Sequence, residues 1–456
     1  MRSDVLILGS GQAGVPLAAR LAAAGKRVVL AERKDLGGTC VNVGCTPTKT
    51  MMASARAAHV ARRAGRLGVR TGDVRVDLSA VVDRKDAIVQ QWRSGVRRRL
   101  EKAGDRLTLV EGHARFVGAR EVEVNGERNH AETVIINVGA RPVVPPIEGL
   151  DRVPWLDNAR MMEVRELPSH LVVIGGGYIG CEFGQMFRRF GSQVTILDRS
   201  EHLLDREDPE TSEALEAAFR EEGIHLRLNG RAKSVSATGK GITVRLEDGD
   251  EVRGSHLLVA VGRRPNTDDL GADAAGIELD ERGFVVVDDH YRTSAAGVYA
   301  VGDVTGGPQF THTSWDDHRI LFDHLQGRGA RSRANRIVPF TVFTDPQVAR
   351  VGLTEKEAKA RDVPYEAASM PFAHIARAIE IDEPAGVMKV LIDPATERVL
   401  GAVIVGAEAG ELIHIFVALM QADASVRAIV DAEAVHPTFA EGVQSLVQRL
   451  DRYSEA

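Results

Sequence analysis

Hydrophobic residues fall in short runs separated by longer amphipathic stretches over most of the chain. Residues 4–8 (DVLIL) predict a buried strand, 15–25 an alanine-rich helix, and 27–31 (RVVLA) a second strand. The same plan returns with predicted strands at 171–174 (LVVI) and 193–197 (QVTIL) and a helix between them. Uninterrupted apolar strands that alternate with helices are typical of parallel sheets. The pattern therefore predicts an α/β fold with two similar units.

A glycine-rich turn follows the first predicted strand of each unit and opens its helix. The glycines of the two turns are Gly9, Gly11 and Gly14, and Gly175, Gly177 and Gly180. In each unit an acidic residue, Glu32 or Asp198, ends the next strand at the same distance from the first glycine. Such glycines allow a tight turn, a close approach of pyrophosphate to the helix N-terminus, and close packing of helix on strand. A glycine-rich turn alone is weak, but this context repeated twice predicts two Rossmann-like dinucleotide sites.

The pattern changes along the rest of the chain. Residues 105–137 and 229–261 predict short strands with turns, and 285–304 predicts a strand at VVVD followed by VYAVGDV. From about Arg336 the apolar runs predict an antiparallel sheet, without a phosphate-binding turn. The helices predicted in this last part cover 354–361, 408–422 and 440–451. A third, C-terminal α+β domain is therefore expected.

Composition and charge narrow the class of protein. The 456 residues suffice for about three domains. Their net charge of −6 argues against nucleic acid as a partner, so a basic run on one helix is expected to be a solvated face. That run consists of Arg93, Arg97, Arg98 and Arg99. No signal-peptide pattern is present, and the longest apolar helical stretch, 412–420, is too short to span a membrane, so a cytoplasmic protein without a membrane partner is expected.

Two of the three cysteines lie close together in the segment GGTCVNVGCTPTK at 37–49. Cys40 and Cys45 come just after the first dinucleotide unit, at a predicted junction of loop and helix. A helix N-terminus favours the thiolate, so this spacing indicates a redox-active dithiol. Zinc binding is an alternative, but it would need a second ligand pair at comparable spacing. Packing of two small apolar residues is the other alternative, and no metal site is predicted.

These motifs together resemble the pyridine nucleotide–disulfide oxidoreductases, which include glutathione reductase, dihydrolipoamide dehydrogenase and mercuric reductase. The resemblance rests on GGTCVNVGCTPTK and also on NVGARP with Gly139, GGGYIGCEFG, VGRRPNT with Gly262, VYAVGDV and HPTFAE. It implies an FAD domain interrupted by an NAD(P) domain, and a homodimer. The domains that the resemblance implies are 1–145 and 269–337 for FAD and the central segment, 146–268 for NAD(P), and 338–456 for dimerisation.

The resemblance also implies roles for residues around the flavin. Gly9, Gly11 and Gly14 would hold the FAD pyrophosphate, Glu32 the adenosine ribose and Asp303 the flavin side chain. Cys45 resembles the thiol that abuts the flavin as a charge-transfer thiolate, and Cys40 the thiol that attacks substrate. Three further residues match the lysine near the flavin, its ion-pair partner and the ring that shields the flavin until nicotinamide arrives. They are Lys49, Glu182 and Tyr178.

His436 in HPTFAE is the candidate acid/base, because imidazole titrates near neutral pH and can take a proton from a thiol. Glu441 could orient the ring and stabilise its charged form. The resemblance implies that this pair serves the active site of the partner subunit. For the nucleotide, Asp198 favours NADH by hydrogen bonding to the ribose, whereas Arg199 could pair with the phosphate of NADPH, so use of both donors is expected.

The substrate is expected to be a small oxidant. The segments 37–49, 306–320 and HIARAIE are similar to the mercuric-reductase-like branch that includes reactive-chlorine-resistance flavoproteins, which are associated with hypothiocyanous acid and copper(II). Activity as a dihydrolipoamide dehydrogenase, a glutathione-reductase-like enzyme or a mercuric reductase remains an alternative. Mercury reduction is disfavoured because no cysteine follows Cys181. Cys40, Cys45 and His436 argue against two other classes, a ferredoxin-type reductase and a non-catalytic FAD-binding protein.

Overall fold

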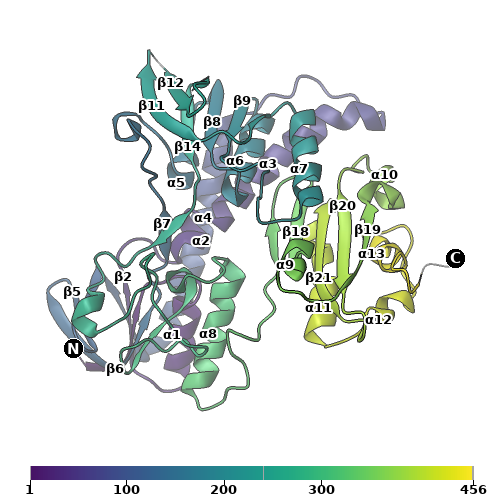
Figure 1. Cartoon of the computed structure of the whole chain (residues 1–456). Helices are drawn as coiled ribbons and strands as arrows, with labels where there is room; N and C mark the ends of the chain where they lie inside the picture. Colours follow the sequence, from purple (N-terminus) through teal and green to yellow (C-terminus); the bar gives the residue numbers. More distant parts are fainter. Residues whose placement is uncertain (1, 240, 454–456) are drawn as a thin grey trace. The chain divides into compact units, whose positions relative to one another are not determined.

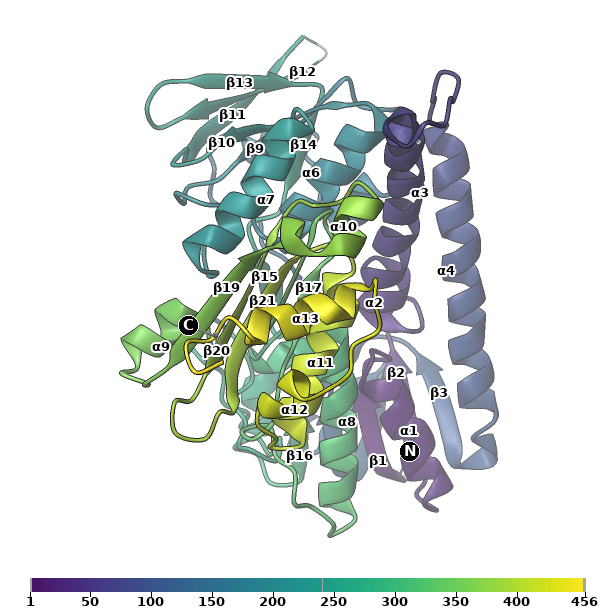
Figure 2. The ribbon, with the colours of Figure 1, turned by 90° about the vertical axis from the view of Figure 1, so that its right-hand side faces the viewer.

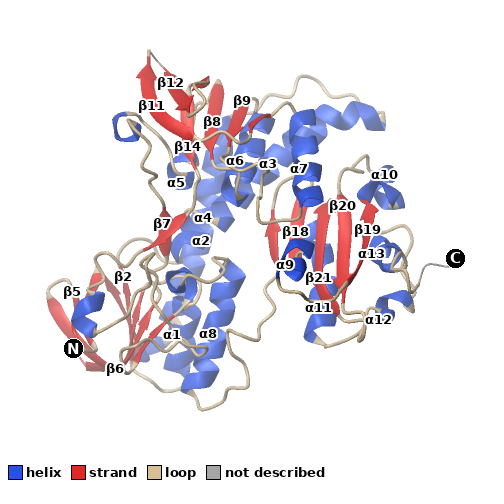
Figure 3. Cartoon of the chain, in the orientation of Figure 1, coloured by secondary structure: helices blue, strands red, loops and turns tan. Residues whose placement is uncertain are grey.

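The structure is a computed structural model that describes residues 2–239 and 241–453 (Figure 1). Contacts within the chain divide it into two compact units, which both mix helices and strands (Figure 3). The first unit comprises the chain through Met51, Ser79–Val143 and Gly262–Arg336. The second unit comprises Met52–Leu78, Val144–Val261 and the chain from Ile337 onward. The four-part division expected from the family resemblance remains a prediction.

A seven-stranded sheet forms the centre of the first unit, in the order β3-β2-β1-β6-β5-β4 with β16 beside β6. The neighbours of β1 and β2 are parallel, whereas β5 is antiparallel to both of its neighbours. The strands are β1 (Arg2–Leu8), β2 (Val28–Glu32), β3 (Leu107–Glu111), β4 (Ala114–Gly118), β5 (Glu121–Val124), β6 (Glu127–Ile136) and β16 (Val298–Ala300). Every residue of β2 is buried, which explains the apolar run of its first four residues before Glu32.

Helix α1 (Gly14–Ala23) packs on this sheet, and the helices α2 (Gly38–Asn42) and α3 (Cys45–Arg63) carry the redox segment. Helices α1 and α8 (Thr311–Leu325) pack against each other. The short helix α2 precedes α3, which belongs to the second unit from Met52 onward, and α4 (Leu78–Glu101) carries the basic run. A two-stranded ladder joins β7 (Ala140–Pro142) to β15 (Arg263–Pro265).

The strand predicted at 285–288 does not form, so this prediction was wrong. Val285 makes one isolated bridge with Leu279, and its N–H bonds to the Val304 carbonyl at 2.9 Å. The next amide, of Val286, bonds instead to Glu278 at 3.0 Å. The segment is extended and half-buried, but its hydrogen bonds go to scattered loop positions, so no ladder can develop.

The second unit contains a four-stranded parallel sheet in the order β10-β9-β8-β14 and a three-stranded antiparallel sheet, β11-β12-β13. Their strands are β8 (His170–Ile174), β9 (Gln193–Leu197), β10 (His225–Arg227), β11 (Ala232–Thr238), β12 (Gly241–Leu246), β13 (Glu251–Gly254) and β14 (His256–Val259). Three helices accompany them, α5 (Asn158–Met161), α6 (Tyr178–Phe190) and α7 (Pro209–Glu221). Since α6 follows β8 directly, this sheet repeats the strand–turn–helix plan of the first unit.

The C-terminal part of the second unit is the expected antiparallel sheet, in the order β17-β18-β21-β20-β19. Its strands are β17 (Phe340–Val342), β18 (Gln347–Gly352), β19 (Glu366–Pro371), β20 (Val387–Ile392) and β21 (Val399–Gly406). Helices α11 and α13 contact each other and pack on the sheet, α11 on β18 and β21 and α13 on β19 and β20 (Figure 2). The helices here are α9 (Glu355–Ala360), α10 (Ala376–Glu380), α11 (Ala409–Gln421), α12 (Arg427–Val430) and α13 (Phe439–Val447).

Short 3₁₀ helices complete the fold: Ala64–Leu67, Gly104–Arg106, Leu150–Arg152, Ala272–Ala275, Gly302–Thr305 and Phe372–His374. Within 2–239 and 241–453, none of the helices is long and apolar enough to cross a membrane.

Candidate active site

Both glycine-rich turns have the backbone that a dinucleotide site requires. Gly9 and Gly175 have φ values of +103° and +113°, a region that residues with a side chain rarely adopt. The third glycines lie where helix and strand meet. A Cβ on Gly14 would be 2.1 Å from the Gly9 carbonyl oxygen, and a Cβ on Gly180 would be 1.8 Å from that of Gly175. Each turn therefore excludes side chains at these positions for the same steric reason.

Glu32 ties the first turn to the redox segment. Its carboxylate accepts hydrogen bonds from the backbone N–H and the hydroxyl of Ser10, at 2.9 and 2.7 Å. The Ser10 hydroxyl in turn accepts a bond from the Gly37 N–H at 3.1 Å. The segment that carries Cys40 is thus fixed against the phosphate-binding turn. Since the acid, the turn and the helix N-terminus of α1 meet at one edge of the sheet, this part of the chain fits the adenosine and pyrophosphate of FAD.

Asp198 plays the same part in the second unit. Its carboxylate accepts bonds from the N–H of Gly176 at 2.5 Å and of Ser200 at 2.7 Å. A Cβ on Gly177 would meet open space, which leaves room for a pyrophosphate beside the α6 N-terminus. Arg199 is exposed next to Asp198. Asp198 and Arg199 therefore lie at the edge of this candidate site. The sequence predicts that these two residues determine the preference between NADH and NADPH.

Asn137 was missed by the sequence analysis, although it lies within the NVGARP motif. Its side-chain oxygen accepts the N–H of Gly14 at 2.9 Å, and its amide donates to the Val301 carbonyl at 3.0 Å. Asn137 therefore joins the helix of the first turn to the segment before Asp303. A polar residue directly after the apolar strand β6 was the available sign of such a role.

The two cysteines lie at consecutive helix starts. Cys40 is half-buried in α2, whereas Cys45 is exposed at the first position of α3. Their thiols are in hydrogen-bond contact, and the Cys45 sulfur lies 3.1 Å from the Thr311 hydroxyl at the N-terminus of α8. The hydrogen bond from Cys45 and burial raise the pKa of the Cys40 thiol. The spacing therefore brings the two sulfurs together, as a dithiol requires.

Arg93 supports the redox segment and is not part of a solvated face as the sequence analysis expected. Its guanidinium donates to the Asn42 side chain at 3.0 and 2.8 Å and pairs with Asp35 at 3.1 Å. Asn42 in turn donates to the Gly38 carbonyl at 2.9 Å. Arg97, by contrast, makes only an exposed ion pair with Glu111. One arginine of the basic run therefore holds α2 in place.

Asp303 is half-buried in the first unit, and its desolvation raises the pKa of its carboxyl. It pairs with Arg263 at 3.3 Å, and Arg263 also donates to the Ala140 carbonyl at 2.6 Å. Gly302, the preceding residue, donates its N–H to Asp317 at 2.7 Å. The turn that carries Asp303 is thus fixed from two sides, and a half-buried carboxylate acceptor fits a hydroxyl of the flavin side chain.

Gly139 and Gly262 lie at the ladder between β7 and β15. Both have positive φ, +68° and +128°. The Gly262 carbonyl accepts the Val143 N–H at 2.9 Å, and the Gly139 carbonyl accepts the Asn266 N–H at 3.0 Å. The two motifs therefore meet in the structure, although more than a hundred residues separate them in the sequence.

Lys49 and Glu182 lie in different units, so their pairing remains a prediction. Lys49 is half-buried in α3. Glu182 is buried in α6, where its carboxylate accepts the Phe343 N–H at 2.9 Å. Tyr178 begins the same helix and stacks on Phe340, with ring centroids 5.2 Å apart and an interplanar angle of 23°. Burial raises the pKa of Tyr178 to about 12.

His436 and Glu441 form the pair that the sequence predicts. Nδ1 of His436 lies 2.8 Å from the Glu441 carboxylate. The histidine side chain is 71% exposed, whereas that of Glu441 is 19% exposed. The Thr438 hydroxyl accepts the Glu441 N–H at 3.2 Å and so caps α13. The carboxylate is therefore held by its helix, and the imidazole presents its other nitrogen at the surface.

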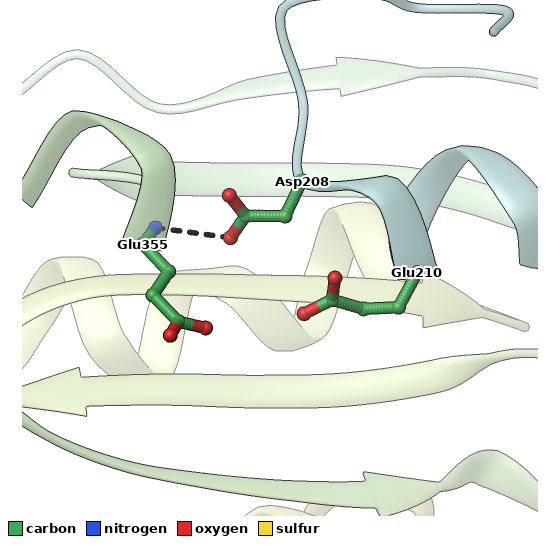
Figure 4. A group of neighbouring side chains, drawn as sticks. All are labelled: Asp208, Glu210 and Glu355. Atoms are coloured by element: carbon green, nitrogen blue, oxygen red, sulfur yellow. Dashed lines mark hydrogen bonds between the residues drawn. The ribbon is translucent and has the colours of Figure 1, made fainter. Parts of the chain in front are cut away.

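A cluster of three acids, Asp208, Glu210 and Glu355, resembles a metal site but holds a lysine. Figure 4 shows the three carboxylates beside one another, with the Glu355 N–H donating to Asp208 at 2.9 Å. The ammonium of Lys389 pairs with all three acids. Hydrogen bonds from Lys359 and Lys389 lower the pKa of Glu355 to about 2. The cluster is therefore an ion-pair network that joins α7 and α9 to β20.

The family models place the chain among known proteins. Residues 3–317 match the pyridine nucleotide-disulphide oxidoreductase family, and residues 338–447 match the dimerisation domain of that family. Curated relatives cover almost the whole chain. A mercuric reductase of Lysinibacillus sphaericus is 36% identical over 98% of this chain and 83% of the relative. A dihydrolipoyl dehydrogenase of Thermus scotoductus is 35% identical over 98% of this chain and 97% of the relative.

A third relative is matched in both sequence and structure. The probable pyridine nucleotide-disulfide oxidoreductase RclA of Escherichia coli is 36% identical over 97% of this chain and 98% of its own length. Its solved Cu(II) complex, described as an HOCl-induced flavoprotein disulfide reductase, superposes with a TM-score of 0.90 over 98% of this chain and 99% of that one. With the paired cysteines and the two nucleotide turns, these matches show that the chain belongs to the pyridine nucleotide–disulfide oxidoreductases, enzymes that depend on FAD and take electrons from NAD(P)H.

Proposed function

We propose that this enzyme passes electrons from NAD(P)H through the Cys40–Cys45 pair to a small electrophilic oxidant of the hypothiocyanous acid type. The observation that carries the proposal is the end-to-end match to RclA, a reductase described as induced by HOCl. Bound FAD would supply the relay of electron pairs from nicotinamide to disulfide. The remaining steps belong to residues of this chain.

Cys40 makes the attack. Its thiolate displaces hydroxide from hypothiocyanous acid and forms a sulfenyl thiocyanate on Cys40, and hydroxide takes a proton to become water. The Cys45 thiolate then attacks the Cys40 sulfur, forms the disulfide and releases thiocyanate. The oxidant has gained two electrons, and the dithiol has lost two. The assignment of Cys40 as the attacking thiol rests on the family resemblance, and the hydrogen-bond contact between the two thiols supports the second step, from Cys45 to Cys40.

His436 transfers the proton of the substrate or of the attacking thiol. The Glu441 carboxylate orients the imidazole through its contact with Nδ1 at 2.8 Å. The exposed ring is suited to serving a site on a second copy of the chain, in keeping with the dimerisation domain of the family. We infer composite active sites in a homodimer. Mixing Cys40→Ser and His436→Ala chains should restore activity after subunit exchange, because each heterodimer keeps one intact site. Exchange without recovery would contradict shared sites.

The nucleotide donor should not be strictly selected. The Asp198 carboxylate already holds two backbone N–H groups, yet it keeps lone pairs for a ribose hydroxyl, while the exposed Arg199 can approach a 2′-phosphate. An exposed charge pair is worth about 1 kcal/mol or less, so both donors should be used. Asp198→Ala should shift the ratio of kcat/KM toward NADPH, whereas an unchanged ratio would refute a role for Asp198.

A substrate panel tests the proposal. The FAD-loaded enzyme is assayed at one saturating NAD(P)H concentration with hypothiocyanous acid, Cu(II), Hg(II), glutathione disulfide and, in reverse with NAD⁺, dihydrolipoamide. The highest kcat/KM is expected for hypothiocyanous acid. Dihydrolipoamide is the serious competitor, because a dihydrolipoyl dehydrogenase matches almost the whole chain. If dihydrolipoamide or glutathione disulfide exceeded every small oxidant, the enzyme would act on organic disulfides or dithiols.

A further inference from the structure

A small polar cavity lies within the second unit, between the start of α7 and the antiparallel sheet. Its volume is about 10 Å³, which is room for about one water molecule. Five polar side chains line it. Those of Asp208 and Thr354 already accept hydrogen bonds from backbone N–H groups at the start of α9. The other three are Glu207 just before α7, Thr211 in the first turn of α7, and Arg350 on β18. Glu207 and Thr211 are 2% and 0% exposed. The cavity is therefore closed to bulk solvent on the side of these two residues.

These three residues present polar atoms without a partner in the described part of the chain. They are both carboxylate oxygens of Glu207, the Thr211 hydroxyl and Nε of Arg350. Nε lies 2.9 Å from the Glu207 carboxylate, an ion-pair distance, but the N–H is not aligned for a hydrogen bond. Buried polar groups are rarely left unsatisfied in proteins. Orphaned atoms that converge on one cavity point to a bound polar molecule.

A neutral water fits this set better than an ion. A cation would lie beside the Arg350 guanidinium, and an anion would lie beside the Glu207 carboxylate. Water offers two hydrogens and two lone pairs. The two carboxylate oxygens of Glu207 can take the hydrogens, and the Thr211 hydroxyl and the Arg350 Nε–H can each donate to a lone pair. All four orphaned positions are then satisfied by one molecule.

Arg350 is linked through Phe340 to Tyr178, the ring that the family resemblance implies shields the flavin. The Arg350 guanidinium lies over the Phe340 ring, 5.1 Å from its centroid, and Phe340 stacks on Tyr178 at 5.2 Å. Arg350 is held on its other side by the Gly352 carbonyl at 2.9 Å and the Glu357 carboxylate at 3.1 Å. The negative charge of Glu207 also raises the pKa of the Tyr178 phenol. A change in the position of Arg350 therefore reaches Tyr178 through two contacts, from Arg350 to Phe340 and from Phe340 to Tyr178.

We propose that the cavity binds one water molecule, which joins Glu207, Thr211 and Arg350 into a polar cluster that fixes Arg350 over Phe340 and so positions the Tyr178 ring. The part that concerns Tyr178 rests on the proposed function, in which electrons pass from nicotinamide to flavin, and on the shielding role that the family resemblance implies for this ring. Burial raises the pKa of Glu207 to about 7, so its carboxylate is mostly ionised at pH 8. At pH 8 both oxygens of Glu207 are therefore acceptors for the water, so the experiments are done at that pH.

A high-resolution crystal structure of the FAD-loaded enzyme at pH 8 tests the site itself. We expect one density peak within hydrogen-bond distance of Glu207, Thr211 and Arg350. An empty cavity, or a peak with the contacts of an ion, would overturn the water site. This result does not depend on any role of Tyr178.

Binding measurements test the link to the ring. Thr211→Val removes one partner of the water, and Ser212→Ala is the matched control, because it removes a neighbouring buried hydroxyl of α7 that does not line the cavity. If Tyr178 shields the flavin while it stacks on Phe340, nicotinamide enters only when the ring leaves Phe340, so a weaker stack should tighten binding. Thr211→Val and Glu207→Gln should lower the Kd of the oxidised holoenzyme for NAD⁺ about threefold to tenfold, and Ser212→Ala should not.

A Tyr178→Ala variant separates the two proposals. If this variant binds NAD⁺ and its flavin is reduced as in the wild type, the shielding role that the resemblance implies for Tyr178 fails, whereas the electron transfer of the proposed function stands. If Tyr178→Ala changes the Kd but Thr211→Val and Glu207→Gln do not, the positioning role of the cluster is overturned. If the cluster acts through the ring, Glu207→Gln should have no further effect in the Tyr178→Ala background. An equal effect in both backgrounds would also contradict the link.

Discussion

Replacing Lys389 by methionine should destabilise the enzyme more than replacing any exposed lysine. The ammonium of Lys389 pairs with Asp208 at 3.3 Å and also with Glu210 and Glu355. The side chains of Lys389 and Asp208 are only 6% and 5% exposed. Methionine fills a similar volume without the charge, so the three carboxylates would lose the one cation that they share, and among the described residues only Glu355 would keep a cationic partner, the exposed Lys359.

The size of the loss follows from burial. Removing one partner of a buried ion pair costs about 3–5 kcal/mol, because the other charge stays buried and uncompensated. Glu210 and Glu355 are 39% and 25% exposed, so water screens part of their repulsion. We therefore expect a free energy of unfolding lower by about 3 kcal/mol, at the low end of this range.

Lys359→Met is the matched control, because Lys359 pairs with the same Glu355 at 2.7 Å but is 66% exposed. This variant should lose about 1 kcal/mol or less. Guanidinium unfolding of the FAD-loaded enzyme at pH 7.5, followed by far-ultraviolet circular dichroism at equal protein concentrations, compares the two. Equal losses in the two variants would refute the argument that burial of Lys389 makes the cluster stabilising.

Three further predictions concern single contacts. In Glu207→Gln, Arg350 keeps the Glu357 carboxylate as a partner at 3.1 Å. Because the pKa of Glu207 is raised, the favourable contribution of its carboxyl is complete below pH 4.5 and is lost as pH rises through about 7. The free energy of unfolding of the variant relative to the wild type should therefore rise by up to about 3 kcal/mol between pH 4.5 and pH 8, and a constant difference would contradict this reasoning. Thr311→Val should disfavour the Cys45 thiolate relative to the thiol, because it removes the hydroxyl that contacts the sulfur. In partly reduced enzyme, the long-wavelength charge-transfer absorption band that this thiolate is expected to form with the oxidised flavin should then need a pH about one unit higher to develop, and an unshifted titration would exclude this role. Glu441→Gln should lower kcat for dihydrolipoamide about tenfold by weakening the hold on His436, with a much smaller change for hypothiocyanous acid; equal losses would contradict the assigned proton transfer.

The features predicted correctly from sequence are local. Each glycine turn, its strand and its helix lie within a few tens of residues, and the steric demands on Gly14 and Gly180 act between near neighbours. Cys40 and Cys45 lie in the first turns of consecutive helices, so their spacing alone brings them together. The hydrogen bond between His436 and Glu441 follows in the same way from the start of one helix.

The features missed from sequence join distant parts of the chain. Asn137 bonds to Gly14, and Thr311 contacts Cys45, across more than a hundred residues in each case. Arg93 seemed solvated because helix periodicity does not say which element covers a charged face. The strand expected at 285–288 failed for the same reason, since alternation of apolar residues does not supply a partner strand. Patterns along the chain specify elements, whereas tertiary packing specifies their partners.

Anaerobic titration with NADH tests most directly whether electrons pass through the cysteine pair. The oxidised wild-type enzyme should take up about two equivalents per chain, one for the flavin and one for the Cys40–Cys45 disulfide, with the long-wavelength band appearing after the first. Cys45→Ser should take up about one equivalent and show no such band. A Cys45→Ser enzyme that still accepts two equivalents and reduces hypothiocyanous acid at the wild-type rate would contradict the account.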